Sequence, residues 1–225
     1  MRVLGLDPSL TNFGWALHDT ETHRGTAARL LARGRFQTPA KMEFIDRYVS
    51  QRERLVELIK LHQPDRVGLE FPVFDQMFSE GMYGLFLFVS EALKTSRCDV
   101  VFWSPLQIKA HARDSLVDSE GNPARPKGWK MDKVDMVEAA GMDTGISRWN
   151  HNEADAYLAA VLAGRFWKLF DGTLSEADLT PTEARYFLEV KEFLRGKMAG
   201  KTVKKGVMFR ENDRFFSWSH RQESL

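Results

Sequence analysis

The sequence contains very little cysteine and no long apolar run. Its 225 residues include one cysteine, Cys98, which cannot form an internal disulfide and leaves no cysteine-rich zinc site. No stretch of 18 apolar residues is present, and the first ten residues carry a strand pattern rather than a secretion signal. These absences predict a cytoplasmic chain in which any metal site is built without sulfur.

An excess of charge of one sign is also lacking. The formal net charge is +1 at pH 7, yet residues 195–225 contain eight Lys or Arg against three Asp or Glu. With 43% hydrophobic and 28% charged residues, the composition is that of an ordinary globular protein. We therefore expect one core domain followed by a basic C-terminal segment.

Strands and helices alternate along most of the chain. Apolar runs predict strands at residues 2–6, 12–18, 28–36, 66–71 and 99–103. Apolar residues at helical spacing predict helices at 42–62, 83–93, 105–117, 132–140 and 153–169. The segment 118–130 holds two prolines and two glycines among charged residues and is expected to be an exposed loop. This order predicts an α/β fold with parallel strand pairs.

A carboxylate stands where the first apolar strand ends. Asp7 follows Val3, Leu4 and Leu6 and is followed by Pro8, which belongs to a turn. A buried carboxylate is costly unless it is paired, protonated or bound to a metal ion. Asp-Pro after a strand is also common in turns, so Asp7 is either a functional ligand or a structural cap.

Two further carboxylates occupy comparable positions. Glu70 ends another apolar strand, where Gly68 indicates the close approach of a backbone or a ligand. Asp155 lies four residues after His151 and three after Asn152, so a helix places the three on one face. A solvated strand terminus is the alternative for Glu70.

Three acids that are distant in sequence could converge at one end of a sheet. Carboxylate oxygens without thiolates favour hard ions such as Mg²⁺ or Mn²⁺. Two such ions about 3.5–4 Å apart can activate water and stabilise the leaving oxygen in phosphodiester hydrolysis. Convergence of Asp7, Glu70 and Asp155 would therefore suit a metal-dependent nuclease.

At these positions the sequence resembles RuvC-type Holliday junction resolvases, especially their phage-like members. The resemblance rests on the segment 5–11 (GLDPSLT) with Gly14, on Leu69-Glu70 and on the segment 153–156 (EADA), and it covers roughly residues 1–168. It implies a ribonuclease H-like fold, with a five-stranded mixed sheet and helices on both faces. It also implies a homodimeric endonuclease that uses two Mg²⁺ or Mn²⁺ ions per site to nick a four-way DNA junction symmetrically, in the host cytoplasm if a phage encodes it.

The resemblance implies a role for each acid. Asp7 would bridge both ions, and Glu70 and Asp155 would complete the ligand set. The family commonly has an Asp or a His three residues before the last Asp, where this chain has Asn152, preceded by His151. Either residue could be the fourth ligand, and His151 could instead act as a general base. A neutral fourth ligand would bind the second ion more weakly and favour Mn²⁺.

DNA contacts are expected around the second half of the domain. The resemblance places basic residues that grip the junction arms here, and the candidates are Lys109, Arg113, Arg125, Lys127, Lys130 and Lys133. Phe74 resembles an aromatic residue that the family uses near the unstacked junction centre. Acidic residues share this region, so a merely solvated surface is the alternative. The helix at 83–93 corresponds to the dimer contact of the family.

Residues 169–225 extend past the part that resembles the family. Helical spacing over 182–197 predicts a helical appendage, followed by basic and aromatic residues that could contact DNA or pack on the domain. Rival functions are a related branched-DNA or flap nuclease and a non-catalytic junction-binding protein. An actin-like sugar kinase starts similarly but needs glycine-rich phosphate loops that are not found after Glu70.

Overall fold

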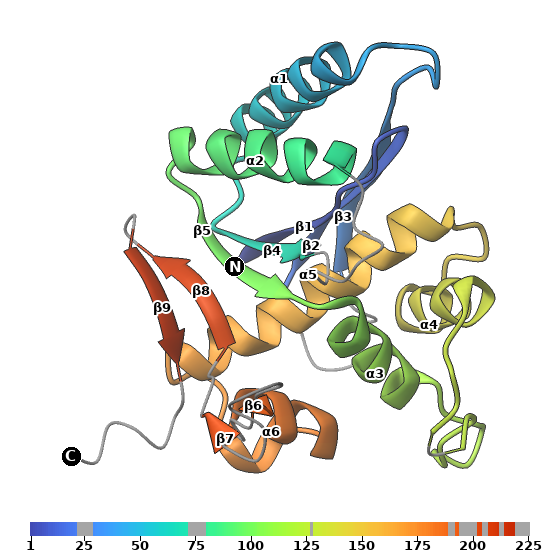
Figure 1. Cartoon of the computed structure of the whole chain (residues 1–225). Coiled ribbons are helices and arrows are strands. Elements are labelled where there is room, and N and C mark those ends of the chain that lie inside the picture. The colour runs from blue at the N-terminus through green and yellow to red at the C-terminus, as the bar shows by residue number, and fades with distance from the viewer. Residues whose placement is uncertain are drawn as a thin grey trace.

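The computed structural model describes residues 1–21, 29–71, 80–126 and 128–188, together with short strands at 192–193, 202–203, 207–211 and 214–218. Its centre is a mixed sheet whose first five strands are β1 (Arg2–Asp7), β2 (Asn12–Asp19), β3 (Arg29–Gln37), β4 (Arg66–Glu70) and β5 (Asp99–Trp103). They lie in the order β3-β2-β1-β4-β5. β2 pairs antiparallel with both β1 and β3, whereas β4 runs parallel to β1 and β5 runs parallel to β4 (Figure 1). This confirms the expected mixed sheet of five core strands.

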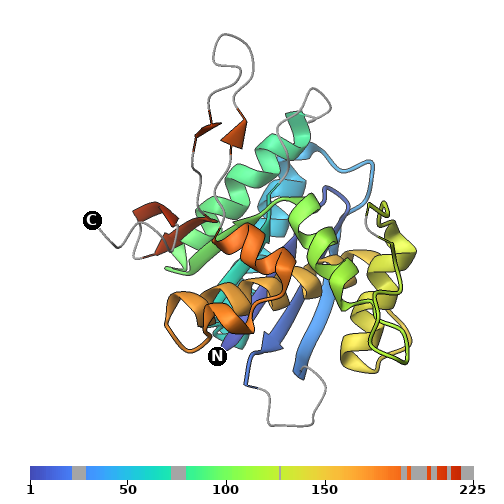
Figure 2. The same cartoon turned by 90° about the horizontal axis from the view of Figure 1, so that it is seen from below.

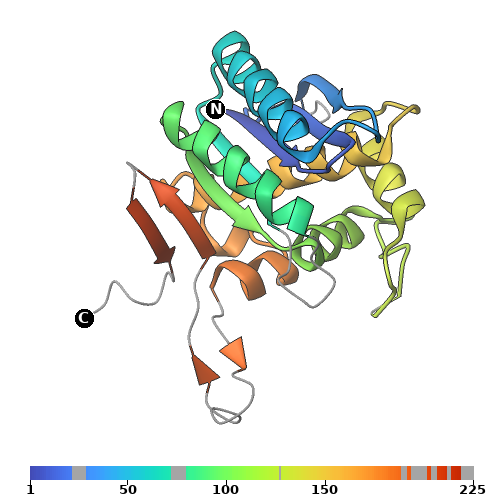
Figure 3. The ribbon, with the colours of Figure 1, turned by 45° about the horizontal axis from the view of Figure 1, so that its top comes forward.

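Two helices cover one face of the sheet. They are α1 (Phe44–His62) and α2 (Glu80–Thr95), which lie side by side above the strands (Figures 1 and 3). Leu4 and Leu6 of β1 point to this side and join a core with Leu55 of α1 and Leu85 of α2. The alternation of side chains along β1 thus separates two cores, because neighbouring residues of a strand face opposite ways.

The other face carries the remaining helices. They are α3 (Pro105–Ser115), α4 (Lys133–Thr144) and α5 (His151–Phe170), and α5 crosses the sheet (Figures 1 and 2). Val3 of β1 packs on this side with Leu158 and Leu162 of α5. Among the described helices, none is long and apolar enough to cross a bilayer.

Glycines let α5 approach the strands closely. A Cβ atom at Gly5 would lie 1.8 Å from the carbonyl oxygen of Ala156, and one at Gly14 would lie 2.1 Å from that of Asn152. At Gly68 a Cβ would lie 2.6 Å from the carbonyl oxygen of Ala159. The close approach expected at Gly68 is therefore the backbone of α5, and this contact sets the height of α5 above the sheet.

The C-terminal extension differs in part from the expected helical appendage. A short 3-10 helix, η1 (Glu176–Asp178), and α6 (Pro181–Phe187) are helical, but α6 ends ten residues before the predicted limit at residue 197. Two strands then extend the sheet: β8 (Val207–Glu211) pairs antiparallel with β5, and β9 (Arg214–Trp218) pairs with β8. Without β8, β5 would leave its backbone groups open along an edge. A separate two-stranded ladder joins β6 (Glu192–Phe193) and β7 (Thr202–Val203).

Candidate active site

Asp7 and Glu70 lie next to each other at one edge of the sheet. Each is the last residue of its strand, and β1 and β4 are parallel neighbours in which Leu6 pairs with Leu69. Carboxyl ends of adjacent parallel strands meet at the same edge, which is where α/β folds place their binding sites. The fold therefore brings Asp7 and Glu70, each predicted at the end of an apolar strand, to the same place.

Asp155 reaches the same edge from α5. Asn152 packs against Gly14 and Ala156 against Gly5, so the helix passes over the ends of β1 and β2 just where Asp155 projects. The helix begins at His151, and Asn150 caps it by accepting a hydrogen bond of 3.0 Å from the backbone N–H of Asn152. The helical spacing predicted for this segment is confirmed.

Burial raises the pKa of all three carboxyl groups, and repulsion between acids adds to the shift at Asp7 and Glu70, although each residue keeps some exposed surface. Burial raises the pKa of Asp7 well above its usual range, and repulsion from Glu70 and Asp155 adds to the shift. Burial raises the pKa of Glu70 to about 8, with a further contribution from Asp155 and an opposing one from Lys109. Burial raises the pKa of Asp155 to about 6, against the attraction of Lys109 and Lys133. The acids therefore share one electrostatic environment that resists three negative charges.

Glu70 and Asp155 line a small cavity of about 120 Å³ together with Lys109 and Lys133. Lys109 comes from α3 and Lys133 from the first turn of α4. The Oδ1 atom of Asp155 is buried and has no hydrogen-bond partner among the described residues. The cavity thus combines an unsatisfied carboxylate oxygen with two cations.

The two candidates for the fourth ligand have different surroundings. Asn152 is buried, and its side-chain N–H donates to the backbone carbonyl of Asn12 on β2. His151 is more open, with its Nε2 atom 3.4 Å from the ammonium of Lys133. Burial lowers the pKa of His151, and the charges of Lys133 and Arg35 lower it further. Asn152 therefore holds α5 on β2, whereas His151 presents a neutral imidazole.

The donor set suits a hard divalent cation in chemistry and charge. Burial raises the pKa of all three carboxyl groups, and one of them has a buried oxygen without a hydrogen-bond partner, so a cation placed among them would stabilise their charged forms. In the arrangement observed over the described residues, no three acidic, histidine or cysteine side chains converge closely enough to hold an ion as they stand. The residues fit such an ion, and binding requires the carboxylates to draw together.

Sequence comparison relates this chain to RuvC. A 70-residue match is 30% identical to the crossover junction endodeoxyribonuclease RuvC of Allorhizobium ampelinum and covers 31% of this chain and 40% of that protein. A 114-residue match to RuvC of Halothermothrix orenii is 27% identical and covers 48% and 66%. These matches therefore span less than two thirds of the length of either relative. No protein-family model matches the chain.

Structural comparison extends the likeness over most of the chain. The structure of Thermus thermophilus RuvC superposes with a TM-score of 0.58 at 20% identity and covers 77% of this chain and 98% of that one. The same protein in complex with a Holliday junction substrate gives a TM-score of 0.59 at 19% identity, with 77% and 97% covered. The chain is RuvC-like in sequence and in fold. The resemblance expected from the motifs is confirmed.

The RuvC-like core places the predicted DNA-binding residues in different surroundings. Lys109 and Lys133 enter the site cavity, and Lys130 is exposed. Arg113 lies 3.3 Å from Asp114. Lys127 and Phe74 lie outside the described residues.

Arg125, which was also predicted to contact DNA, forms ion pairs with two acidic residues of α4. Its guanidinium pairs with Asp135 at 2.9 Å and with Glu138 at 2.6 Å. Asp135 also accepts from the indole N–H of Trp129 at 2.9 Å, so Arg125 fastens the 118–130 loop to α4. The spacing of charges in the sequence does not reveal this pairing.

Two arginines that contact the first turn of α5 were not predicted. Arg33 and Arg35 lie on the same side of β3 and reach Glu153 at 3.5 and 3.4 Å. Arg33 also lies over the ring of Trp149, 4.1 Å from its centroid. The available signal was their i, i+2 spacing in a strand, which places both side chains on one face.

Proposed function

We propose that the chain is a structure-selective DNA endonuclease that resolves four-way junctions by metal-dependent phosphodiester hydrolysis. The observation that carries the proposal is the convergence of Asp7, Glu70 and Asp155 from β1, β4 and α5 at one edge of a RuvC-like sheet. This arrangement offers clustered acids, which is what hydrolysis by a metal-activated water requires.

Asp7, Glu70 and Asp155 would hold the metal ions, with Asp7 between the other two. Bound Mg²⁺ or Mn²⁺, two ions per site, would activate water and stabilise the leaving oxygen of the scissile phosphate. Before binding, burial and repulsion favour protonated carboxyl groups, so the site releases protons when it takes up cations. Lys109 and Lys133 offset the acids' charge and can turn toward the phosphate.

For the fourth position we favour His151 over Asn152. The amide N–H of Asn152 is used to hold Asn12, which fixes the orientation of its side chain at the contact between α5 and β2. His151 is neutral, partly exposed and on the same helical face as Asp155. A neutral imidazole can bind a cation or accept a proton from water.

The DNA surface would begin at the two site lysines. Lys109 and Lys133 stand beside the acids, Arg113 lies further along α3, and Lys130 lies in the segment that joins α3 to α4. Backbone phosphates are held mainly by such cations. Lys127 and Phe74 are proposed as further contacts on the basis of the sequence. A DNA substrate implies a cytoplasmic location.

We also propose a homodimer joined through α1 and α2. Large apolar side chains are about half-exposed on these helices, namely Phe44 (53%), Ile45 (57%), Val49 (39%), Tyr83 (49%) and Leu87 (52%). Phe44 stacks on Tyr48, which contacts Phe88, so the two helices form a continuous surface. A two-fold dimer would present two sites to the two strands of a junction that are cut symmetrically.

Residues 1–168 would form the nuclease domain and residues 169–225 its extension. Phe187 of α6 is fully buried, with its ring centroid 5.8 Å from those of Trp103 and Phe166. We therefore propose that the extension stabilises the domain rather than folding apart from it.

Cleavage of labelled DNA tests the proposal directly. A four-way junction, a flap, a replication fork and a linear duplex are each incubated with the full chain in Mg²⁺, Mn²⁺ or EDTA. Paired nicks at symmetric positions of the junction, absent in EDTA and absent with Asp7→Asn, are expected. Preferential cutting of flaps or forks would instead identify a related branched-DNA nuclease. Tight junction binding without cleavage in either metal would identify a junction-binding protein.

A further inference from the structure

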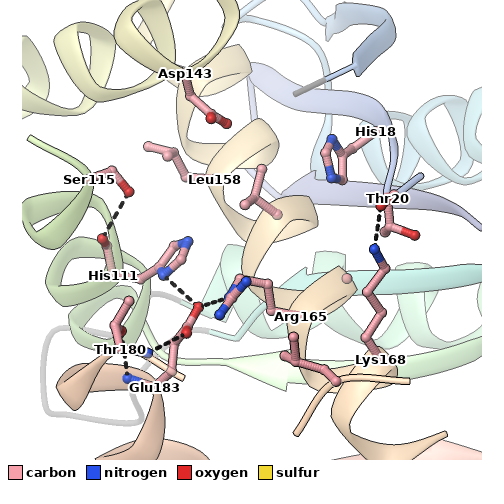
Figure 4. A pocket seen from close by; sticks show the side chains of 13 residues that line it. His18, Thr20, His111, Ser115, Asp143, Leu158, Arg165, Lys168, Thr180 and Glu183 are labelled. Carbon is pink, nitrogen blue, oxygen red and sulfur yellow. Dashed lines mark hydrogen bonds and ion pairs between the residues drawn. The ribbon is translucent and has the colours of Figure 1, made fainter. Parts of the chain in front are cut away.

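A second cavity lies among α3, α4, α5 and α6. It is separate from the site of Asp7, Glu70 and Asp155, which is called the acidic site below. Its volume is about 470 Å³, within the range of small-molecule sites, and it shares no lining residue with the smaller cavity at Glu70 and Asp155. Figure 4 shows His111 and Glu183 on one side and His18, Thr20 and Lys168 on the other. Leu174, Thr180 and Glu183, which follow α5 in the chain, also line the cavity.

Several buried polar atoms in this cavity have no hydrogen-bond partner among the described residues. They are Nδ1 of His18, Oγ1 of Thr20 and both ring nitrogens of His111, and each of the three residues is only 5% exposed. Nδ1 of His111 lies 3.5 Å from Glu183 without forming a hydrogen bond. Unsatisfied buried polar groups cost free energy, so their gathering around one cavity points to a ligand.

The acids of the cavity are already paired within the protein. Glu183 accepts hydrogen bonds from Nε of Arg165 and from the backbone N–H of Thr180 at 2.9 Å. Asp143 accepts from the hydroxyl of Tyr157 at 2.5 Å. The carboxylates therefore leave little capacity for a cationic ligand.

Lys168 is the cation that remains uncompensated. Its ammonium donates one of three N–H groups to the backbone carbonyl of Thr20, and no acidic side chain among the described residues forms an ion pair with it. The hydroxyl of Thr20 and a ring N–H of His111 or His18 can also act as donors. Unused donors together with a free positive charge suit an oxyanion.

We propose that this cavity binds a small organic anion, in which an oxyanion group is carried on an apolar body. Lys168 and Thr20, which lie on the same side of the cavity, would contact the oxyanion, and Leu158, Val161 and Leu174 would pack against the body. The volume exceeds that of an inorganic anion, which is why the apolar part is required. A phosphate ester and a carboxylate share this chemistry.

The cavity and the acidic site are built on the same three helices. Each helix lines the acidic site near its N-terminus and the larger cavity further toward its C-terminus, as shown by Lys109 and Ser115 on α3, Lys133 and Asp143 on α4, and Asp155 and Lys168 on α5. A ligand in the larger cavity would therefore contact α5, the helix that positions Asp155.

Titration calorimetry on the full chain in EDTA tests the proposal, with phenyl phosphate, benzoate and neutral phenol as probes. We expect at least one of the two anions to bind more tightly than phenol. Lys168→Met should weaken that binding by about tenfold or more, as expected for loss of a charge-assisted contact. Lys60→Met, on the exposed surface of α1, and Asp7→Asn should leave it unchanged.

Thr20→Val provides a second variant if Lys168→Met fails to fold, and a several-fold weakening is expected from it. Tighter binding of phenyl phosphate than of benzoate would identify a phosphate ester as the preferred class, and the reverse order a carboxylate. No heat with either anion at millimolar concentration overturns the proposal. Equal affinities in the wild-type chain and in the Lys168 and Thr20 variants overturn it as well.

Discussion

The ammonium of Lys133 lies 3.4 Å from Nε2 of His151, and this contact joins the first turns of α4 and α5 beside the acidic site. A charged lysine only donates, so Nε2 accepts and the imidazole proton sits on Nδ1. Burial, Lys133 and Arg35 all lower the pKa of His151, which keeps the ring neutral at pH 7. The imidazole of His151 is therefore neutral, and its Nε2 lone pair can bind a cation or accept a proton when Lys133 turns away from it.

Substitution of His151 should mainly lower activity, and substitution of Asn152 should mainly lower stability. His151→Ala should lower junction cleavage strongly, with little effect on unfolding, because the side chain is partly exposed. Asn152→Ala removes the bond to Asn12 and should lower the free energy of unfolding by about 1–2 kcal/mol while retaining more activity than His151→Ala. Cleavage rates over a titration of Mg²⁺ and Mn²⁺, with urea unfolding of each variant, measure both effects. Wild-type cleavage by His151→Ala would remove His151 from the site.

The raised pKa of Glu70 should make the metal-free protein less stable as the pH rises. The folded state holds this proton up to about pH 8, whereas the unfolded chain loses it near its ordinary value. The unfolded state therefore binds fewer protons over this interval, and the free energy of unfolding falls from about pH 4.5 to about pH 8 and then levels. Glu70→Gln should be more stable than the wild-type chain at pH 9 by a few kcal/mol, and equal to it at pH 4.

Urea unfolding in EDTA across this pH range provides the measurement. Glu57→Gln, which removes an exposed carboxylate on α1, is the matched control and should not change the pH dependence. Addition of Mg²⁺ should stabilise the wild-type chain at pH 8 and have a much smaller effect on Glu70→Gln. A stability difference between Glu70→Gln and the wild-type chain that is the same at pH 4 and pH 9 would contradict the prediction.

The sequence predicts where the three acids lie in the fold, because each is marked by its own local pattern. Asp7 and Glu70 end apolar runs of strand length, and Asp155 lies at helical spacing from His151. The registers of β1 with β4 and the packing of α5 then bring them together without any further sequence signal.

What could not be predicted depends on contacts between distant segments. The spacing of Lys109 and Lys133 marks them only as basic surface residues, and it is the packing of α3 and α4 beside α5 that places them in the cavity with Glu70. The bond between Asn152 and Asn12 joins residues 140 positions apart. The pairing of β8 with β5 likewise needs the edge of the finished sheet, so the strands of the extension could not be distinguished from a helix by periodicity alone.

Lys133 should contribute to DNA affinity through charge. Lys133→Met should weaken binding to a four-way junction and reduce the slope of log affinity against log salt by about one, because one phosphate contact is lost. Lys60→Met on the exposed surface of α1 is the control for the general loss of a positive charge. Fluorescence anisotropy with a labelled junction in EDTA, repeated at several salt concentrations, separates the two. Equal slopes for both variants would place Lys133 outside the DNA surface.

Leu87 should be a contact of the proposed dimer. Its side chain is 52% exposed on α2, next to a groove lined by Arg52, Phe88 and Glu91, so an acidic residue there should not disturb the core. Leu87→Glu should convert a dimer into a monomer, as measured by light scattering at micromolar protein with and without junction DNA, because two like charges would face each other across a two-fold axis. Met142→Glu, at a half-exposed position of α4 on the other face of the sheet, is the control and should remain dimeric.

The monomer formed by Leu87→Glu should still nick a junction, but the two cuts should become independent in time, because symmetric cleavage requires both sites on one substrate. A wild-type chain that scatters as a monomer even with junction DNA would contradict the dimer itself.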